Sequence, residues 1–495
     1  MIKNKQEEKE EQEDCMANQL FNPMSPELLE AMCSKIERKS QINPDDFWKY
    51  GVKRGLRNHD GTGVMAGLTK ICAVEGYYVD DGERVPKKGK LKYRGINIQE
   101  IVDACEKENR FGFEEVAYLL IFGSLPSKEQ LDLFRNALGL CRRLPEDFIE
   151  DVIMKNASFD VMNEMARCVL ALYSYDETAD DTSLENVLRQ SIQIISQMPL
   201  IMSYAYQVKR HKYYGKSMYF HPDKPDLSTA ELVLRCIRSD RKYTDEEAKL
   251  LDFCLMLHAE HGGGNNSTFT CRVLTSSGTD SYAAYSSAIG ALKGPRHGGA
   301  NIKVCHMLDD MLLHIEDVTD EAQVAAYLEK IIRKEAGDRS GLVYGMGHAV
   351  YTISDPRAQI LKEKARKFAE RSGFQKEFTL ACLIEKLTPE VFRRITGSSK
   401  PLCANVDLYS GIVYKLLDIP EDLFTPLFAS ARIAGWSAHR MEELLTGGRI
   451  IRPAYKSVAL PKRYVPLDER ISNYLTNATY VPAEDRLYTE GEENV

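Results

Sequence analysis

The sequence VLRQSIQIISQMPLIMSYAYQVKRH, residues 187–211, places apolar side chains on more than one face of the helix that it would form. Such a helix is typical of the centre of a large helical body. Polar residues interrupt the apolar run too often for it to cross a bilayer. We therefore expect a protein built around a buried helix, with most of the chain α-helical.

The rest of the chain follows the same pattern, with one exception near the N-terminus. Helical spacing of apolar residues dominates from Ile98 onward, and residues 113–138 break at Gly123 and Pro126 before a helix restarts after the cap residue Ser127. Residues 62–98 are rich in Val, Tyr, Gly and turn pairs, which predicts short strands or hairpins. The predicted fold class is mainly α-helical with a small β region.

Composition limits the kinds of partner. The formal net charge is −8 and there is no long basic run, so we expect neither nucleic acid nor a membrane surface but a small molecule. Residues 1–14 mix acidic and basic side chains without an apolar core, unlike a secretory or transit signal, and a cytoplasmic location is expected. Ser25 and Pro26 predict the first helix. The 12 cysteines form no C-x-x-C pair and are expected to be mostly reduced core residues.

A turn rich in Gly and Pro surrounds His297 in KGPRHGGANIKV, residues 293–304. Apolar residues then recur at helical steps, so this histidine precedes a helix N-terminus. The positive end of the helix dipole favours a neutral imidazole there. A turn histidine that merely caps the helix is the alternative interpretation.

Two more histidines stand in LHAEHGGGNNSTFT, residues 257–270, where a predicted helix ends at a run of glycines. His258 and His261 are three residues apart and share a helix face, so they could converge on a metal, or one could point into a cleft. The alternative is a solvated or capping histidine, which suits His258 better than His261.

In GLVYGMGHAVYTISDPRAQILKEKARKF, residues 341–368, glycines free the backbone beside His348. Asp355 and Pro356 predict a helix start that places Arg357 in the first turn. A guanidinium beside free helix N–H groups suits a carboxylate or a phosphate. The alternative for this arginine is a surface salt bridge.

The last chemical signals lie in the C-terminal part of the chain. Asp407 precedes an apolar helix and is expected as an N-cap that can project into a pocket. Arg432 falls on the apolar face of a helix, and Arg452 stands before a proline in a loop. A buried arginine requires an anion.

Together these residues favour carbon–carbon bond formation next to a carbonyl, which needs a carboxylate base, neutral donors to two oxygens, and cations for a dicarboxylate. A metal hydrolase built on His258, His261 and a further histidine is a second hypothesis, disfavoured by the lack of H-E-x-x-H and by the arginines. A non-catalytic helical scaffold is a third.

Seven segments closely resemble the citrate synthase family, in the order in which that family has them. They are KLKYRGINIQEIV, FEEVAYLLIFGSLP, HAEHGGGNNSTF, GPRHGGAN, GHAVYTISDPRA, NVDLYSG and RIAGWSAHRMEELLTGGRIIRP, and the resemblance runs from about Lys90 to Lys456. The resemblance implies a two-domain helical homodimer with the site in the cleft between the domains. The implied divisions are a tail and first helix over 1–60, a large domain from 61–297 and 412–460, a small domain over 298–411, and a tail over 461–495.

The resemblance also implies the roles of individual residues. Asp407 removes a methyl proton from acetyl-CoA, His297 donates to the thioester oxygen, and His348 protonates the carbonyl oxygen of oxaloacetate. The residues implied to hold oxaloacetate are His261, Arg357, Arg432 and, from the other subunit, Arg452. Those implied to contact CoA are Tyr344, Gly345, Met346, Gly347 and Lys400. Neither a metal nor a cofactor is implied besides the co-substrate acetyl-CoA.

The sequence leaves two points open. The same residues serve 2-methylcitrate synthase, which uses propionyl-CoA, and one methylene changes binding by only ~1–3 kcal/mol. Arg296 and Thr352 depart from the family pattern, where a Leu or Met and, in many bacterial relatives, a basic residue are usual. The roles of these two residues stay open.

Overall fold

The computed structural model describes residues 25–58, 61–81, 83–295, 297–398, 400–461 and 463–470. Arg296 and the outer parts of both predicted tails lie outside the described residues. The chain divides into two units, residues 60–452 and residues 1–59 together with 453–495. All the candidate site residues belong to residues 60–452, and the division of this unit into a large and a small domain stays a prediction.

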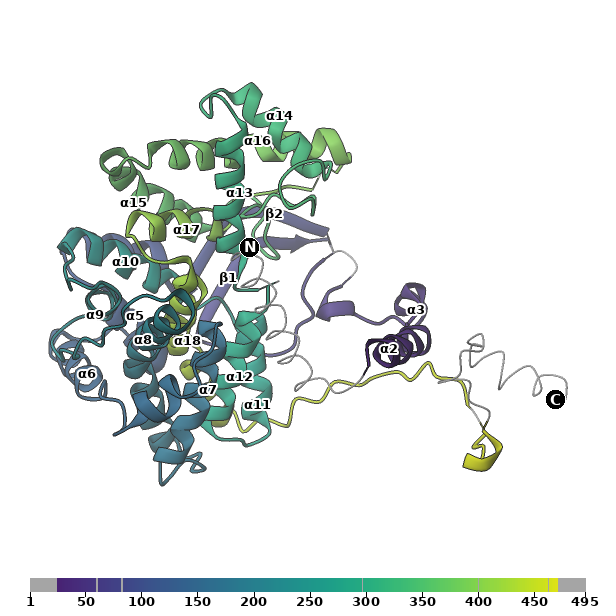
Figure 1. Ribbon diagram of the computed structural model, residues 1–495, viewed down its shortest axis with the longest axis horizontal. Coiled ribbons are helices and arrows are strands. Elements are labelled where there is room, and N and C mark those ends of the chain that lie inside the picture. The colour runs from purple at the N-terminus through teal and green to yellow at the C-terminus, as the bar shows by residue number, and fades with distance from the viewer. Residues whose placement is uncertain are drawn as a thin grey trace, which may run out of the picture. The chain divides into compact units, whose positions relative to one another are not determined.

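Helices dominate residues 60–452, and the predicted fold class is confirmed (Figure 1). The three strands are β1 (Cys72–Asp80), β2 (Glu83–Tyr93) and β3 (Ile96–Asn97). The helices before the candidate site are α4 (Ile98–Lys107), α5 (Phe113–Phe122), α6 (Lys128–Leu140), α7 (Val161–Ala171), α8 (Leu184–Tyr214), α9 (Thr229–Ile237) and α10 (Asp245–His258). Those that follow are α11 (Asn266–Ser276), α12 (Ser281–Lys293), α13 (Ala300–His314), α14 (Glu321–Ile332), α15 (Pro356–Ser372), α16 (Gln375–Thr396), α17 (Asp407–Leu416) and α18 (Phe424–Leu445).

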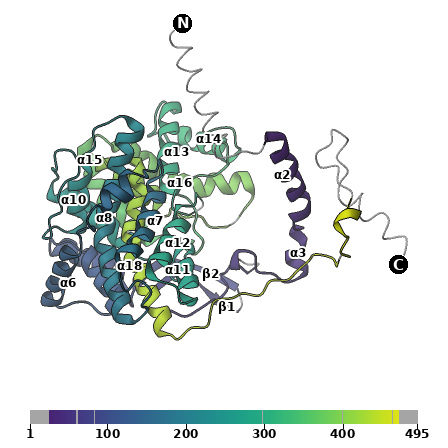
Figure 2. The ribbon, with the colours of Figure 1, turned by 60° about the horizontal axis from the view of Figure 1, so that its bottom comes forward.

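Two long buried helices form the centre of this unit (Figure 2). Helix α8 contains the apolar stretch 187–211, begins after the cap Ser183, and ends at Gly215, whose φ of +62° favours glycine. Helix α18 packs against α8 and also against α5, α10, α11, α12 and α13. Because α18 is buried on nearly all sides, any charged residue on it needs a partner inside the protein.

Local signals set the helix boundaries as expected. Gly123 ends α5 in the left-handed conformation, and the Ser127 side chain caps α6 by accepting from Gln130 N. None of the helices in the described residues is long and apolar enough to cross a membrane. The cysteines among those residues are free thiols, and most of them are buried.

The unit of residues 1–59 and 453–495 contains two described α-helices, α2 (Pro26–Ser40) and α3 (Pro44–Lys49), and two short 3₁₀ helices, Arg54–Leu56 and Leu467–Glu469. Ser25 accepts from Leu28 N and Pro26 is the first helical residue, which confirms the predicted helix start. Asn43 and Pro44 repeat the same arrangement at α3.

The β hairpin supports the loop that follows His348. Strands β1 and β2 pair antiparallel from Cys72 opposite Tyr93 to Asp80 opposite Glu83. Thr352 Oγ1 donates to Gly76 O at 3.0 Å, and Gly89 N donates to Ser354 Oγ at 3.2 Å. Glycine is required for this close approach, because a Cβ at Gly76 would overlap Val350 O and lie 2.8 Å from Tyr351 Cα. Thr352 therefore serves as a packing contact between the hairpin and the loop.

Gly76→Ala is expected to destabilise the protein by about 1–3 kcal/mol, because the added methyl group must push the loop at Val350 away from the hairpin. Gly67→Ala is the matched control, since a Cβ there meets no atom within 4 Å. The free energy of unfolding from denaturant titration tests this, and equal stability of the two variants would contradict the packing described.

Candidate active site

Five segments far apart in the sequence bring most of the candidate residues into one cluster. His261 follows α10, and its ring centroid lies 5.1 Å from that of His348 in the loop before α15. Burial is the main cause that lowers the pKa of His261, followed in order by repulsion from Arg357, from His348 when protonated, from Arg432 and from His297 when protonated. These groups are therefore close enough to act on one another electrostatically.

The hydrogen bonds of His348 indicate its tautomer. Its Nδ1 accepts from Val350 N and from Tyr351 N, both at 3.0 Å. A nitrogen that accepts these bonds carries no proton in the neutral ring, so the proton is on Nε2. The ring also stacks on Tyr351, with centroids 4.6 Å apart. The neutral ring is thereby oriented with Nε2 as a donor.

Asn405 connects the loop of His348 with the start of helix α17. Its Nδ2 donates to Gly347 O at 2.9 Å, and its Oδ1 accepts from Asp407 N at 3.0 Å. Its backbone N also donates to Gly345 O at 2.9 Å. Gly345 and Gly347 have φ of +80° and +92°, and a Cβ at Gly345 would lie 2.9 Å from Leu408 Cα. Glycines thus allow the two segments to approach, and Asn405 holds them together.

Asp407 is the first residue of α17, and the prediction that it caps this helix is wrong. Val406 occupies the N-cap position, and Asn405 supplies the oxygen that accepts from the backbone N of Asp407. Burial raises the pKa of Asp407 to about 6, with Asp355 raising it further and Arg357 and Arg432 opposing the rise. A carboxyl group with this pKa can accept a proton and release it near neutral pH.

His297 lies on the turn before α13, as predicted. Its backbone N donates to Gly294 O at 2.8 Å, and its Nε2 lies 3.2 Å from Ser267 Oγ. A Cβ at Gly298 would overlap Leu292 O, so the chain can pass there only with glycine. The pKa of His297 is lowered to about 4, first by burial and then by Arg432. The ring is neutral as expected, but burial rather than the helix dipole is the leading cause.

Arg432 lies fully buried on α18. Its Nε donates to His258 O at 2.6 Å. Its two terminal nitrogens, Nη1 and Nη2, have no hydrogen-bond partner among the described residues. Leaving a buried charged donor unsatisfied costs free energy, so this guanidinium is suited to an anion that reaches it from the cluster.

Arg357 is also buried, and the surface interpretation of this residue is wrong. It lies in the first turn of α15 as predicted, where Asp355 caps the helix by accepting from Arg357 N at 3.0 Å. The Asp355 carboxylate also accepts from Arg357 Nε at 3.1 Å and from Nη2 at 2.7 Å. Arg357 is therefore held in place by an internal carboxylate.

His258 differs from its predicted environment. It is fully buried at the end of α10 and stacks on Phe428, with centroids 4.2 Å apart, so the solvated interpretation is wrong. Burial, with Arg357 and Arg432 as lesser causes, holds its pKa well below the usual range. No group of three or more His, Cys, Asp or Glu in the described part of the chain is arranged to hold a metal ion, so the metal-hydrolase hypothesis lacks a ligand set there.

Sequence reasoning missed a buried network behind His261. Glu260 Oε1 lies 3.0 Å from His439 Nε2 and accepts from Gly262 N at 2.5 Å. His439 Nδ1 lies 2.9 Å from Arg272 Nη1. Nothing in the sequence predicts that Glu260 pairs with His439 or that His439 pairs with Arg272. The one available indication was the position of Glu260, an acidic residue directly before His261. Asn405 and Ser267 were likewise not singled out.

The remaining candidates lie at the edge of the cluster or outside it. Tyr344 Oη donates to Asp338 and accepts from Lys303 Nζ at 3.2 Å, and Met346 forms a β-bridge with Ala404. Lys400 and Arg452 are exposed. Within the described residues the Arg452 side chain has neither a hydrogen bond nor an ion pair, and the structure does not bring it into the cluster of its own chain.

Comparisons with known proteins agree with one another. Residues 58–454 match the family described as citrate synthase, C-terminal domain. The citrate synthase of Haloferax volcanii is 34% identical over 425 residues, which cover 85% of this chain and 99% of the relative. The 2-methylcitrate synthase 1 of Corynebacterium glutamicum is 30% identical over 423 residues, which cover 85% of this chain and 98% of that relative. A citrate synthase of Thermoplasma acidophilum, solved with carboxymethyl coenzyme A and oxaloacetate, superposes with a TM-score of 0.67 at 27% identity, over 82% of this chain and 97% of that one.

The low pKa of His297 is directly testable. Nuclear magnetic resonance of the histidine ring nitrogens should show His297 neutral down to a pH of about 4. Arg432→Gln should raise this pKa, because the guanidinium charge that disfavours the imidazolium is removed. A pKa that does not respond to this substitution would show that Arg432 does not act on the ring.

Proposed function

This chain belongs to the citrate synthase family, and we propose that it condenses acetyl-CoA with oxaloacetate and water to give citrate and CoA. The observation that carries the proposal is the cluster of Asp407, with its pKa raised to about 6, together with two neutral imidazoles and an unsatisfied buried guanidinium. These are a base, two neutral donors and a cation, the groups that enolisation and attack on a keto diacid require.

In this proposal Asp407 accepts a proton from the methyl group of acetyl-CoA. The thioester oxygen gains negative charge as the enol forms, and neutral His297 donates a hydrogen bond to it. A neutral donor suits this role, because its pKa lies far closer to that of an enol than an imidazolium's would. Ser267 Oγ, near His297 Nε2, orients the ring.

The enol carbon then attacks the carbonyl carbon of oxaloacetate, and His348 Nε2–H gives a proton to the carbonyl oxygen. The proton that Asp407 accepted leaves to solvent and His348 takes one up from solvent, which restores both groups. Arg432, through Nη1 and Nη2, binds one carboxylate of oxaloacetate. Arg357 and His261 are the other residues of the same chain that are proposed to bind oxaloacetate. Water hydrolyses the thioester of citryl-CoA, which releases citrate and the CoA thiol. The proposal uses neither a metal nor a cofactor.

The proposal includes a homodimer in which Arg452 of one subunit completes the site of the other. Its exposure on a single chain is compatible with this arrangement. Tyr344, Gly345, Met346, Gly347 and, more weakly, Lys400 are proposed to contact CoA. A cytoplasmic location stays a prediction.

A second candidate is 2-methylcitrate synthesis from propionyl-CoA. It is favoured by the relative from Corynebacterium glutamicum, which aligns with 85% of this chain. Both reactions use the same groups on oxaloacetate and differ by one methylene on the acyl group.

Release of free thiol from acetyl-CoA and from propionyl-CoA, each with and without oxaloacetate, tests the proposal and ranks the two acyl groups. Release should require oxaloacetate, and Asp407→Asn should lower turnover by about 10²–10⁴-fold. In the wild type kcat/KM should fall below a pH of about 6, because Asp407 must be ionised to accept a proton. Thiol release that is indifferent to oxaloacetate would mean a thioesterase instead.

Asn405→Ala should lower kcat by about 10–100-fold, the usual effect of losing an outer hydrogen-bond partner, with a smaller change in the KM for oxaloacetate. Asn405→Asp should also move the acidic limb of the pH profile upward, because a second carboxylate beside Asp407 raises its pKa. Asn163→Asp, which adds the same charge at an exposed position of α7, is the control. If the Asn405 variants lose stability but keep kcat and the pH profile, the residue only supports the fold.

A further inference from the structure

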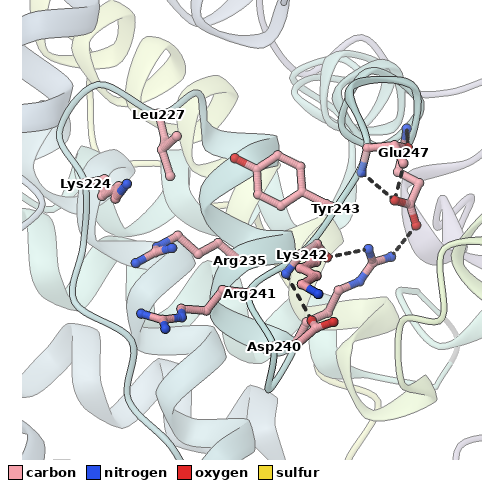
Figure 3. A pocket seen from close by; sticks show the side chains of 10 residues that line it. Lys224, Leu227, Arg235, Asp240, Arg241, Lys242, Tyr243 and Glu247 are labelled. Atoms are coloured by element: carbon pink, nitrogen blue, oxygen red, sulfur yellow. Dashed lines mark hydrogen bonds and ion pairs between the residues drawn. The ribbon is translucent and has the colours of Figure 1, made fainter.

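A separate cavity opens beside helices α9 and α10 (Figure 3), and none of the candidate active-site residues lines it. Its volume is about 770 Å³, within the range of roughly 300–1,000 Å³ that small-molecule sites occupy. The lining residues come from the loop before α9, from α9 itself, and from the loop into the first turn of α10. They are Lys224, Leu227, Arg235, Arg238, Asp240, Arg241, Lys242, Tyr243, Thr244 and Glu247.

Cations outnumber acids on this lining, and both acids are already engaged. Glu247 accepts from Arg238 Nη2 at 2.7 Å and caps α10 by accepting from Thr244 N. Asp240 accepts from Lys242 N at 3.0 Å. Only Arg238 among the lining cations is neutralised by a carboxylate of the lining. The lining therefore carries more positive than negative charge.

Three of the cations have no protein partner. Among the described residues the side chains of Lys224, Arg235 and Arg241 form neither a hydrogen bond nor an ion pair, and Arg235 Nε is inaccessible to solvent and unsatisfied. In Figure 3 the guanidinium groups of Arg235 and Arg241 point the same way, toward the side on which Lys224 lies. No ion pair joins these three cations to a carboxylate of the described residues, although Asp223 and Asp226 act electrostatically on the same neighbours as Arg235. An anion among the three cations relieves the repulsion between their like charges.

The walls of the cavity are fixed by hydrogen bonds from elsewhere in the fold. Arg142 donates to Lys224 O at 2.6 Å and to Leu227 O, which holds the loop before α9. Arg238 donates to Lys242 O at 3.0 Å and to Leu417 O at 2.7 Å, which holds the opposite loop. Arg241 has a φ of +61°, an uncommon value for a residue with a side chain. The site is therefore largely formed before any ligand arrives.

We propose that this cavity binds a small molecule through a diphosphate group. Two guanidinium forks and an ammonium match the several oxygens of linked phosphoryl groups, since arginine binds phosphate through paired parallel hydrogen bonds and lysine as a point charge. Tyr243 and Leu227 form an apolar part of the lining, against which the remainder of such a molecule packs. The inference does not depend on the proposed condensation.

Calorimetric titration of the full-length protein with inorganic pyrophosphate tests the site. We expect one equivalent to bind, orthophosphate to bind at least about tenfold more weakly, and affinity to fall as salt is raised. Arg235→Gln/Arg241→Gln should weaken pyrophosphate binding at least about tenfold, while condensation activity and the thermal midpoint stay those of the wild type. Arg235→Lys/Arg241→Lys, which keeps the charge but loses the forks, should bind with intermediate affinity.

Two control variants separate this site from other sources of binding. Arg333→Gln/Arg394→Gln removes the same charge at exposed ion pairs with Glu329 and should leave binding unchanged. Lys400→Gln alters the region proposed for CoA and should also leave it unchanged. The proposal is overturned if the double variant of Arg235 and Arg241 binds pyrophosphate normally, or if only Lys400→Gln loses binding.

Discussion

The unsatisfied guanidinium of Arg432 is the constraint around which the candidate site is arranged. A full positive charge lies in the middle of the most buried helix, with one nitrogen bonded to His258 O and two without a partner in the described residues. Its field lowers the pKa of His297, His261 and His258 and limits the rise in the pKa of Asp407. Burial is the larger cause of the low pKa values of these histidines, and this buried cation lowers them further. At Asp407 it opposes, together with Arg357, the rise in pKa that burial causes.

The geometry of the cluster depends on contacts between backbone segments more than on contacts between its side chains. Asn405 fixes the distance between the loop of His348 and the start of α17. The β hairpin lies against the next part of the same loop through Gly76 and Gly89, whose missing Cβ atoms allow backbone contact. A loop held from two sides keeps the His348 ring in one orientation, which proton transfer over a hydrogen-bond distance requires.

The sequence predicted local features well, because capping and helical periodicity act over a few residues. Ser25, Ser127 and Asp355 cap helices as expected, and the buried helix over 187–211 is part of α8. The pairings that shape the site span long separations, 58 residues from Asn405 to Gly347 and 179 from Glu260 to His439, and no pattern in one sequence reveals them. Asp407 shows how a local rule fails: aspartate favours the N-cap position, but Val406 occupies it here, and Asn405 supplies the side-chain oxygen that accepts from Asp407 N. His258 is buried because Phe428, from a helix far away in the sequence, stacks on it. The spacing of residues around His258 cannot predict this contact.

The pairing of Arg357 with Asp355 affects how an anion is received. Two of the guanidinium nitrogens are occupied by a carboxylate from the same helix start, so an incoming carboxylate can approach mainly along the remaining edge. The long side chain is already confined to one rotamer when the chain folds. The conformational entropy of the Arg357 side chain is therefore lost when the chain folds, whereas a mobile arginine loses it each time an anion binds.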